Sequence, residues 1–321
     1  MKMQRNNFTI LELLFVIACV AIIMSMLLPA FNESREKARF ARWVVFNRQC
    51  SSDPACVVNY NFQDGKGTVV SNSAQGHENS KFKVKDYFGQ VKGDYSWTKG
   101  RWWKGKRALQ FNGVNTIVEL PETEAIDFDE DEEFTIFVWL KFDRFVRWDT
   151  PFCKAYADQY AQYDLYYDGT QYSDKQASGQ FEVDVSRTCI GFDDVTIDDK
   201  GNRSDNIKLD TEHWYMLTLR NKKIQTDPKN AGLSNINDHK VEVFWNGQRL
   251  AERATNNVYA KGTRCNAKLI LGAMRFWSGQ NSGPGWLSCY FRGKIDEFIM
   301  YKRALQDTEI RGHYLMGAEH L

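Results

Sequence analysis

The chain lacks an excess of charge of either sign. Its 321 residues contain 42 lysines and arginines against 41 aspartates and glutamates, which leaves a formal net charge of +1 at pH 7. A nearly neutral chain has no global field that attracts a polyanion, so the composition gives no support for a nucleic-acid partner. Proline is also scarce, with six residues in the whole chain, and this argues against a long disordered stalk.

The cysteines lack the spacing of a zinc site. Cys19 lies in an apolar run, and six cysteines follow it: Cys50, Cys56, Cys153, Cys189, Cys265 and Cys289. Because neither a CxxC pair nor a Cys/His cluster occurs, the alternatives are disulfides or unpaired buried thiols, and an oxidising compartment would favour disulfides. Of the fifteen possible connectivities, we predict neighbour pairing (50–56, 153–189, 265–289), because neighbours bracket local loops or hairpins.

One long apolar run lies near the N-terminus. Residues 1–7 contain Lys2 and Arg5, and the 24 residues of 8–31 contain one charged side chain, Glu12. At a rise of ~1.5 Å per residue the run is ~36 Å long, enough to cross a hydrocarbon core of about 30 Å. It is longer than the apolar part of a cleaved secretory signal (~7–15 residues), and no small-residue cleavage site follows. We therefore predict one membrane-spanning helix with the basic leader in the cytoplasm.

Glu12 is not explained by a plain membrane anchor, because a carboxylate at mid-membrane costs about 2.5–3.5 kcal/mol on insertion scales and needs a partner. The basic leader followed by Phe8-Thr9-Ile10-Leu11-Glu12-Leu13 resembles the N-terminal signal of type IV pilins and type II secretion pseudopilins. The resemblance implies that a prepilin peptidase cuts between Asn7 and Phe8 and methylates the new amine. The family usually has glycine at the position of Asn7.

The same resemblance implies an assembly role for two residues. Glu12 would neutralise the new α-amine of Phe8 or that of a neighbouring subunit, and Pro29 matches a proline that loosens the helix on assembly. It also implies copies of this chain or other pilins as filament partners, contact with inner-membrane lipids, and a single-pass location in the bacterial inner membrane. The head would lie in the periplasm or on an extracellular filament.

We expect three segments: a leader at 1–7, a transmembrane and assembly helix at 8–50, and a head at 51–321. Residues 32–47 remain helix-compatible and carry basic side chains among apolar ones, as in a helix that leaves the bilayer and docks on the head. These basic side chains either contact lipid headgroups or form a solvated helix face.

The head has the pattern of an all-β sandwich or jelly roll, with short apolar-alternating runs between Gly, Asn and Asp. Strands are expected at 56–62, 108–111, 116–120, 134–142, 180–189, 214–220, 240–245, 249–253, 268–273 and 293–301. Asn246-Gly247 predicts a two-residue hairpin turn. In this region we expect no helix longer than that at 306–315.

Three segments of the head resemble the concanavalin A-like, laminin G-type jelly-roll family. They are Ala108–Gly113 with Thr116–Leu120, Trp214–Leu219 with Val241–Gly247, and the closing strand Gly293–Leu305. Together they span most of residues 56–317. The resemblance implies a β-sandwich fold, which serves lectins, glycosidases, calcium-bound adhesion modules and passive scaffolds, so the fold does not assign a function.

An enzymatic role is not expected. Some glycosidases of this architecture carry an E-x-D-x-x-E motif on one strand, because retaining chemistry needs two carboxyl groups about 5 Å apart. The nearest match begins at Glu182 and Asp184, but Arg187 occupies the last position. The carboxylate pair is therefore incomplete, and the alternative is that both acids are ordinary strand residues that face solvent.

A structural Ca²⁺ is a candidate cofactor of the head, and no other cofactor is expected. The acidic run 127–133 is either a calcium-binding segment or a solvated turn before the next strand. Members of the resembled family often hold calcium with the acid of the closing strand, which is Asp296 here. The alternative is that Asp296 forms hydrogen bonds with a neighbouring loop.

Glycan binding would require exposed aromatic platforms among polar residues. Trp277 and Trp286 occur in one Gly-rich stretch, and Trp102 and Trp103 occur in another. The alternative is that these side chains fill or cover the sandwich. Two functions therefore remain open: a structural pilin or pseudopilin subunit, and a membrane-tethered glycan- or ligand-binding module similar to a lectin.

Overall fold

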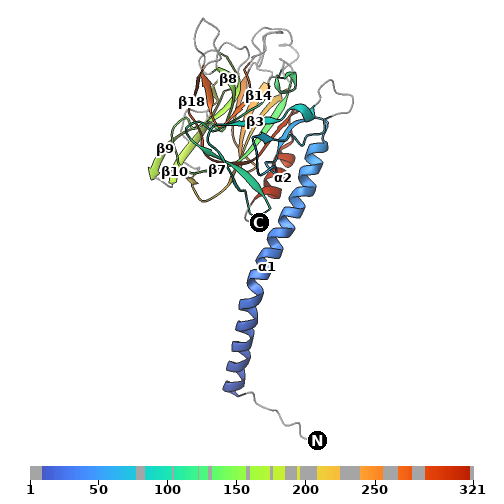
Figure 1. Cartoon of the computed structure of the whole chain (residues 1–321), viewed down its shortest axis with the longest axis vertical. Helices are drawn as coiled ribbons and strands as arrows, with labels where there is room; N and C mark the ends of the chain where they lie inside the picture. Colours follow the sequence, from blue (N-terminus) through green and yellow to red (C-terminus); the bar gives the residue numbers. More distant parts are fainter. Residues whose placement is uncertain are drawn as a thin grey trace.

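A long helix projects from a β-rich head in the computed structural model of this chain (Figure 1). The helix is α1 (Ile10–Ser52), and a second helix, α2 (Asp307–Gly317), contacts it at the head. The structure describes residues 9–76, 84–102, 105–121, 123–128, 132–156, 160–173, 176–184, 194–195, 208–224, 239–255, 267–276 and 286–318. The prediction of one long N-terminal helix followed by an all-β sandwich is confirmed.

α1 begins with a capping box. Its N-cap Thr9 donates from its backbone N and from Oγ1 to Glu12 Oε2, both at 2.8 Å, and Glu12 N donates to Thr9 Oγ1 at 3.3 Å. This T-x-x-E arrangement satisfies backbone donors that a helix start leaves without partners. The helix then runs through Pro29 without interruption to Ser52, so the proline does not end or divide it.

The strands form two main sheets and a small hairpin, and every pairing between named strands is antiparallel. The first sheet contains β1 (Cys56–Tyr60), β4 (Ser96–Lys99), β5 (Arg107–Asn112), β7 (Phe134–Phe142), β13 (Tyr215–Lys223), β14 (His239–Trp245), β15 (Gln248–Thr255) and β19 (Arg292–Tyr301). Its order is β15-β14-β13-β7-β19-β5-β4, and β1 also pairs with β19.

The second sheet contains β2 (Val69–Val70), β3 (Gly89–Lys92), β6 (Ile117–Glu119), β8 (Phe152–Tyr156), β9 (Tyr160–Ser173), β10 (Gln176–Asp184), β11 (Asp194–Val195), β12 (Lys208–Asp210) and β16 (Ile270–Leu271). Its order is β11-β10-β9-β8-β16-β6-β3-β2, with β12 on β10. The hairpin pairs β17 (Met274–Phe276) with β18 (Trp286–Ser288), and short 3₁₀ turns occur at Val84–Asp86 and Glu124–Ile126.

The central strand β7 is buried on both of its faces. Ile136, Val138 and Leu140 point into the core between the sheets, whereas Phe137 and Trp139 belong to a second cluster with residues of α2. Successive side chains of a strand alternate between faces, so one face of β7 supports the sandwich and the other supports the helices. The helices therefore rest on an apolar outer face of the first sheet.

Most of the predicted strands are present, with shifted ends. The run at 134–142 matches β7 to the residue, and the predicted terminal helix at 306–315 corresponds to α2. Asn246 (φ 49°) and Gly247 (φ 75°) both have positive φ, as a two-residue type I′ turn requires. The long hairpin of β8 and β9 had not been predicted, because its Tyr- and Asp-rich sequence lacks a clear apolar alternation.

Gly247→Ala should destabilise the protein by about 1–3 kcal/mol, because an L-residue is strained at positive φ. The added Cβ would also lie 2.8 Å from Tyr314 Cβ of α2. Urea unfolding of the detergent-solubilised full chain measures the effect.

The matched control is Gly312→Ala within α2, where a Cβ meets no heavy atom within 4 Å. Alanine favours a helix over glycine by about 1 kcal/mol, so this variant should be neutral or more stable. Equal destabilisation by both substitutions would contradict the contact between the turn and α2.

Candidate functional site: the long helix and its junction with the head

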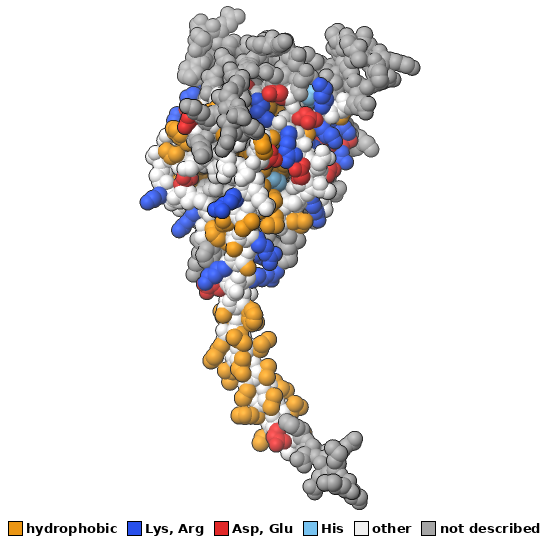
Figure 2. Space-filling model, turned by 90° about the vertical axis from the view of Figure 1, so that its right-hand side faces the viewer, with side chains coloured by type: hydrophobic (Ala, Val, Ile, Leu, Met, Phe, Trp, Pro, Cys, Tyr) orange, Lys and Arg blue, Asp and Glu red, His pale blue; other side chains and the backbone are white. Residues whose placement is uncertain are grey.

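α1 consists of an exposed part and a docked part. The 18-residue segment that is apolar enough to cross a membrane has a mean hydropathy of 2.8, and none of it is buried against the rest of the protein. The buried residues of α1 are Trp43, Asn47, Cys50 and Ser51, which share one helix face. Figure 2 shows the lower helix as an apolar rod below a head of mixed charge. The docking contacts are therefore confined to the last turns of α1.

Glu297 of β19 is the acceptor at the centre of this junction. It accepts hydrogen bonds from Trp43 Nε1 and Asn47 Nδ2 of α1, both at 3.0 Å, and from Arg101 Nη2 at 2.6 Å. Burial raises the pKa of Glu297, but Arg101 and Lys106 outweigh burial and hold that pKa below its ordinary value. The carboxylate is therefore ionised at neutral pH and binds the helix through directional, charge-assisted hydrogen bonds.

Arg101, which follows β4, is fully buried beside two acids of β19. Besides Glu297, it contacts Asp296: its backbone N donates to Asp296 Oδ2 at 2.7 Å, and its Nε lies 2.9 Å from Asp296 Oδ1. The guanidinium carbon lies 4.1 Å from the centroid of the Trp139 ring. A buried cation of this kind is tolerated because its Nε and Nη2 meet carboxylates and its face meets an aromatic ring.

Lys106 completes the cluster next to β5. Its Nζ donates to the backbone oxygens of Asp296 (2.5 Å) and Asn61 (2.8 Å), and it lies 4.5 Å from the centroid of the Trp43 ring. Burial lowers the pKa of Lys106 to about 8. Two cations and two anions thus neutralise one another under α1, and α1 contributes the indole and the amide that cover them.

Asp296 is therefore neutralised by side chains of this chain. Arg101 contacts its carboxylate, and Lys106 Nζ lies 3.9 Å from Oδ2, so a calcium ion at this carboxylate would face two buried cations. The residues around Asp296 therefore do not fit a calcium site. The geometry matches the alternative, in which Asp296 accepts hydrogen bonds from a neighbouring loop, here from Arg101. Part of the acidic run 127–133 lies outside the described residues, and Asp127 is ion-paired with Lys154 at 2.5 Å.

The predicted pairing of Cys50 with Cys56 is wrong in this structure. Both thiols are buried and form no disulfide; Cys50 Sγ lies 3.8 Å from His313 Nε2, and Cys56 Sγ donates to Val58 O at 3.6 Å. The end of α1 and the start of β1 thus direct the two sulfurs toward different partners. The other two predicted pairs involve Cys189 and Cys265, which lie outside the described residues. Cys289 has no disulfide, so the 265–289 pair is absent. Cys153, predicted to pair with Cys189, is buried in β8.

The contact between Cys50 and His313 does not form an activated nucleophile. Burial raises the pKa of Cys50 to about 12 and lowers that of His313 to about 4. At neutral pH both groups are therefore uncharged, whereas a nucleophilic cysteine requires a lowered pKa. The pair is part of the packing between α1 and α2.

The four tryptophans proposed as binding platforms have different positions. Trp102 is buried and its Nε1 donates to Gly317 O of α2 at 2.9 Å, so its role as an exposed platform is wrong. Trp286 is 55% exposed on β18. Trp103 and Trp277 lie outside the described residues.

The processing residues Asn7 and Phe8 also lie outside the described residues, so cleavage between them stays a prediction. Glu182 and Asp184 belong to β10, and Arg187 lies outside the described residues. Among the described residues there is no group of three or more His, Cys, Asp or Glu side chains that could hold a metal ion. Sequence reasoning missed Arg101, whose partners are 195 and 196 residues away.

No protein-family profile and no curated protein matches the chain. Among solved structures, the binding domain of Paraclostridial Mosquitocidal Protein 1 is similar with 15% identity and a TM-score of 0.46, over 81% of this chain and 52% of that one. Domain 4 of AbnA, a GH43 extracellular arabinanase from Geobacillus stearothermophilus solved with arabinotriose, has 16% identity and a TM-score of 0.47, over 82% and 98%. The botulinum neurotoxin serotype G binding domain has 11% identity and a TM-score of 0.47, over 81% of this chain and 51% of that one.

The chain thus spans about half the length of the first of these structures. The fold assignment rests on the strand order and pairing of the chain itself.

Glu297→Gln should destabilise the folded protein by about 3 kcal/mol or more, because it leaves Arg101 buried with one of its two carboxylates. The same change should loosen the end of α1, since Trp43 and Asn47 lose a charged acceptor. Urea unfolding of the full chain in detergent and limited proteolysis near residues 43–52 measure the two effects.

The control is Glu33→Gln, which removes the same charge from an exposed pair with Lys37 at 2.9 Å. Exposed pairs of this spacing contribute less than about 0.5 kcal/mol. If the two variants unfold at the same urea concentration, the buried cluster does not hold the helix to the head.

Proposed function

We propose that this chain is a membrane-anchored, pilin-like structural subunit that assembles through α1 and carries the β-sandwich head at the end of that helix. The observation that carries the proposal is the continuity of α1 from the T-x-x-E start at Thr9 to the buried contacts of Trp43 and Asn47. A single rigid element thus joins an exposed apolar surface to the head. The resemblance of residues 8–13 to prepilin signals adds the assembly role.

The exposed apolar part of α1 requires a partner of low polarity. Ile10, Leu11 and Phe15 are 71–80% exposed, and the large apolar side chains continue around the helix to Phe31. A helix that is apolar on all sides lies in a bilayer or among other apolar helices. Both environments are consistent with a subunit that is stored in the membrane and packs against copies of itself or other pilins.

Glu12 has a double role under this proposal. Its Oε2 accepts the capping bonds of Thr9, and its negative charge lies at the N-terminal end of the helix, where the helix dipole favours an anion. The charge then neutralises an α-amine of the same or a neighbouring subunit after cleavage by a prepilin peptidase. Capping and charge can be separated by substitution.

The proposed orientation places the head outside the cytoplasm. It depends on recognition of the leader, because the head side of the span carries more basic residues than the leader does: four lie within 33–42, against Lys2 and Arg5 in 1–7. Counted alone, these charges favour retaining the head side in the cytoplasm. Orientation is therefore a separate readout, measured by protease accessibility of the head in intact spheroplasts.

Glu12→Gln should abolish recovery of the chain in filaments or in cross-linked complexes with other pilins, while insertion in the membrane is retained. Glutamine keeps the capping box but removes the charge. Co-purification after in-cell cross-linking and alkaline carbonate extraction of membranes measure assembly and insertion separately.

The control is Thr9→Ala, which removes the side-chain cap and keeps the carboxylate of Glu12. It should assemble, with α1 weakened by about 1 kcal/mol at its first turn. Normal assembly of Glu12→Gln would show that the charge of Glu12 is not needed for assembly and would contradict its proposed role.

A second candidate function is ligand binding by the head, and the exposed indole of Trp286 favours it. The backbone nearby is strained: Cys289 has φ 52° and Trp148 has φ 70°. These residues flank an isolated bridge between Thr150 and Tyr290. Strained backbone next to exposed aromatic side chains is a feature of binding sites. A glycan with an apolar sugar face is the class of ligand that such an indole would stack on.

Trp286→Ala should reduce glycan binding by about tenfold or more if this second function holds, because one aromatic platform is lost. Phe88→Ala, at another exposed aromatic (45%), should leave binding unchanged. A glycan array probed with the full chain in detergent gives the measurement. Equal binding by the two variants, or no binding by the unmodified chain, would remove this candidate.

A further inference from the structure

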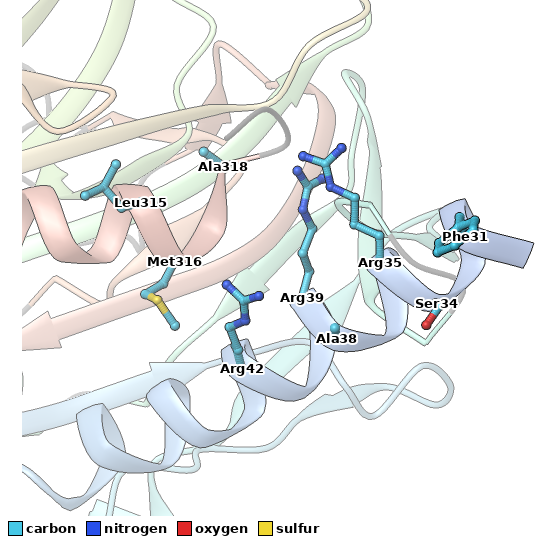
Figure 3. A pocket seen from close by; sticks show the side chains of 9 residues that line it. All are labelled: Phe31, Ser34, Arg35, Ala38, Arg39, Arg42, Leu315, Met316 and Ala318. Carbon is cyan, nitrogen blue, oxygen red and sulfur yellow. The ribbon is translucent and has the colours of Figure 1, made fainter. Parts of the chain in front are cut away.

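A basic groove lies between α1 and the C-terminal end of α2 (Figure 3). Its volume is about 510 Å³. On one side Arg35, Arg39 and Arg42 extend from α1, and on the other Leu315 and Met316 form the wall. The groove is thus cationic along one side and apolar along the other.

The three arginines lie on one face of the helix. Their spacing of i, i+4 and i+7 places them along a single stripe over two turns. In Figure 3 all three side chains leave α1 on the side that faces α2, and Arg42 points toward Met316. Three guanidinium groups are therefore directed toward the same groove.

Acidic residues near the groove neutralise part of this charge. Glu36 pairs with Arg39 at 3.2 Å, and Glu33 pairs with Lys37 at 2.9 Å. Between residues 33 and 42 there are four basic and two acidic residues, so an excess of positive charge remains. The side chains of Arg35 and Arg42 are exposed.

The groove lies directly after the apolar run. Phe31 is the last residue of that run, is 69% exposed and lines the outer end of the groove. At ~1.5 Å per residue, Arg35 follows Phe31 by ~6 Å and Arg42 by ~16 Å along the axis. Because the headgroup layer extends several ångströms beyond the hydrocarbon core on each side, the first arginines lie at its depth when α1 spans the bilayer.

We propose that this groove binds the phosphate of an anionic phospholipid headgroup and so seats the head on the membrane surface. Arginine suits this task because its planar guanidinium binds phosphate oxygens in a bidentate manner. Phe31, at the membrane end of the groove, would contact the glycerol and upper acyl region of the same lipid, while Leu315 and Met316 close the groove on the side of the head. The proposal rests on the membrane placement of α1 in the proposed function, and it identifies a lipid partner and the residues that select it.

The competing interpretation is that the arginines only stabilise α2. The C-terminal end of a helix carries partial negative charge, and α2 has no basic residue in its last turn. In that case the arginines hold Gly317 and its neighbours in place, and no lipid is needed. The two interpretations predict different effects on stability and on lipid retention.

The test compares Arg35→Gln/Arg42→Gln with Lys37→Gln/Arg48→Gln in the full chain. Both double variants remove two charges from exposed side chains of α1, but only the first pair lines the groove. Each protein is extracted in mild detergent from membranes of phosphatidylglycerol and phosphatidylcholine with equal acyl chains. Native mass spectrometry then measures the ratio of the two lipids retained, with and without inorganic phosphate as a competitor.

The unmodified chain should retain phosphatidylglycerol over phosphatidylcholine, and the groove variant should lose this preference by about tenfold. The control variant should keep it. The proposal is overturned if the unmodified chain shows no preference, if both variants lose it equally, or if inorganic phosphate alone displaces the lipid. It is also overturned if the groove variant loses only thermal stability. Carbonate extraction of each variant reports separately whether α1 is anchored, so a failure of anchoring is distinguished from a failure of lipid selection.

Discussion

The buried pairing of Arg101 with Asp296 and Glu297 is the interaction on which the placement of the helix depends. A guanidinium in the protein interior is tolerated only with its carboxylates in place, and the same Glu297 carboxylate accepts the bonds from Trp43 and Asn47 of α1. Apolar packing alone would let α1 slide or turn against the sheet at small cost. The directional bonds to Glu297 fix its axial and rotational position. The cluster therefore fixes the register of α1 relative to the head.

A fixed register has consequences along the whole of α1. Because the helix is continuous from Ile10 to Ser52, the position of Trp43 on the head also sets where Phe31 and the apolar run lie relative to the head. The groove between α1 and α2 keeps its shape for the same reason: Trp102 ties Gly317 of α2 to the loop that carries Arg101. The structural basis of both proposals, assembly through the helix and seating on the membrane, is thus one network in the head.

Local sequence patterns predicted the elements that depend on local physics. A nearly continuous apolar run identifies β7, and Asn246-Gly247 identifies the turn between β14 and β15 because few residues adopt positive φ twice in succession. The junction could not be predicted in this way. Arg101 meets acids almost 200 residues further along the chain, and Asp296 suggested calcium by resemblance because the cation that neutralises it is distant in sequence. Trp102 reads as a surface aromatic in a Gly-rich stretch, yet the end of α2 covers it. The capping role of Glu12 follows the local pattern T-x-x-E, and it is compatible with a second role for the charge of Glu12 in the membrane.

The arginines that follow the membrane span affect both the export of the head and its position at the membrane. A run of arginines directly beyond an apolar helix favours retention of that flank in the cytoplasm, so a chain that exports its head has to overcome their effect. Folding offsets part of this effect, since Arg39 pairs with Glu36. Lipid phosphate offsets the remainder if the groove binds it as proposed. A guanidinium bound to phosphate at the outer surface forms the same charge-assisted hydrogen bonds that it would form at the cytoplasmic surface. The same stripe that opposes export of the head then holds the head against the membrane once export is complete.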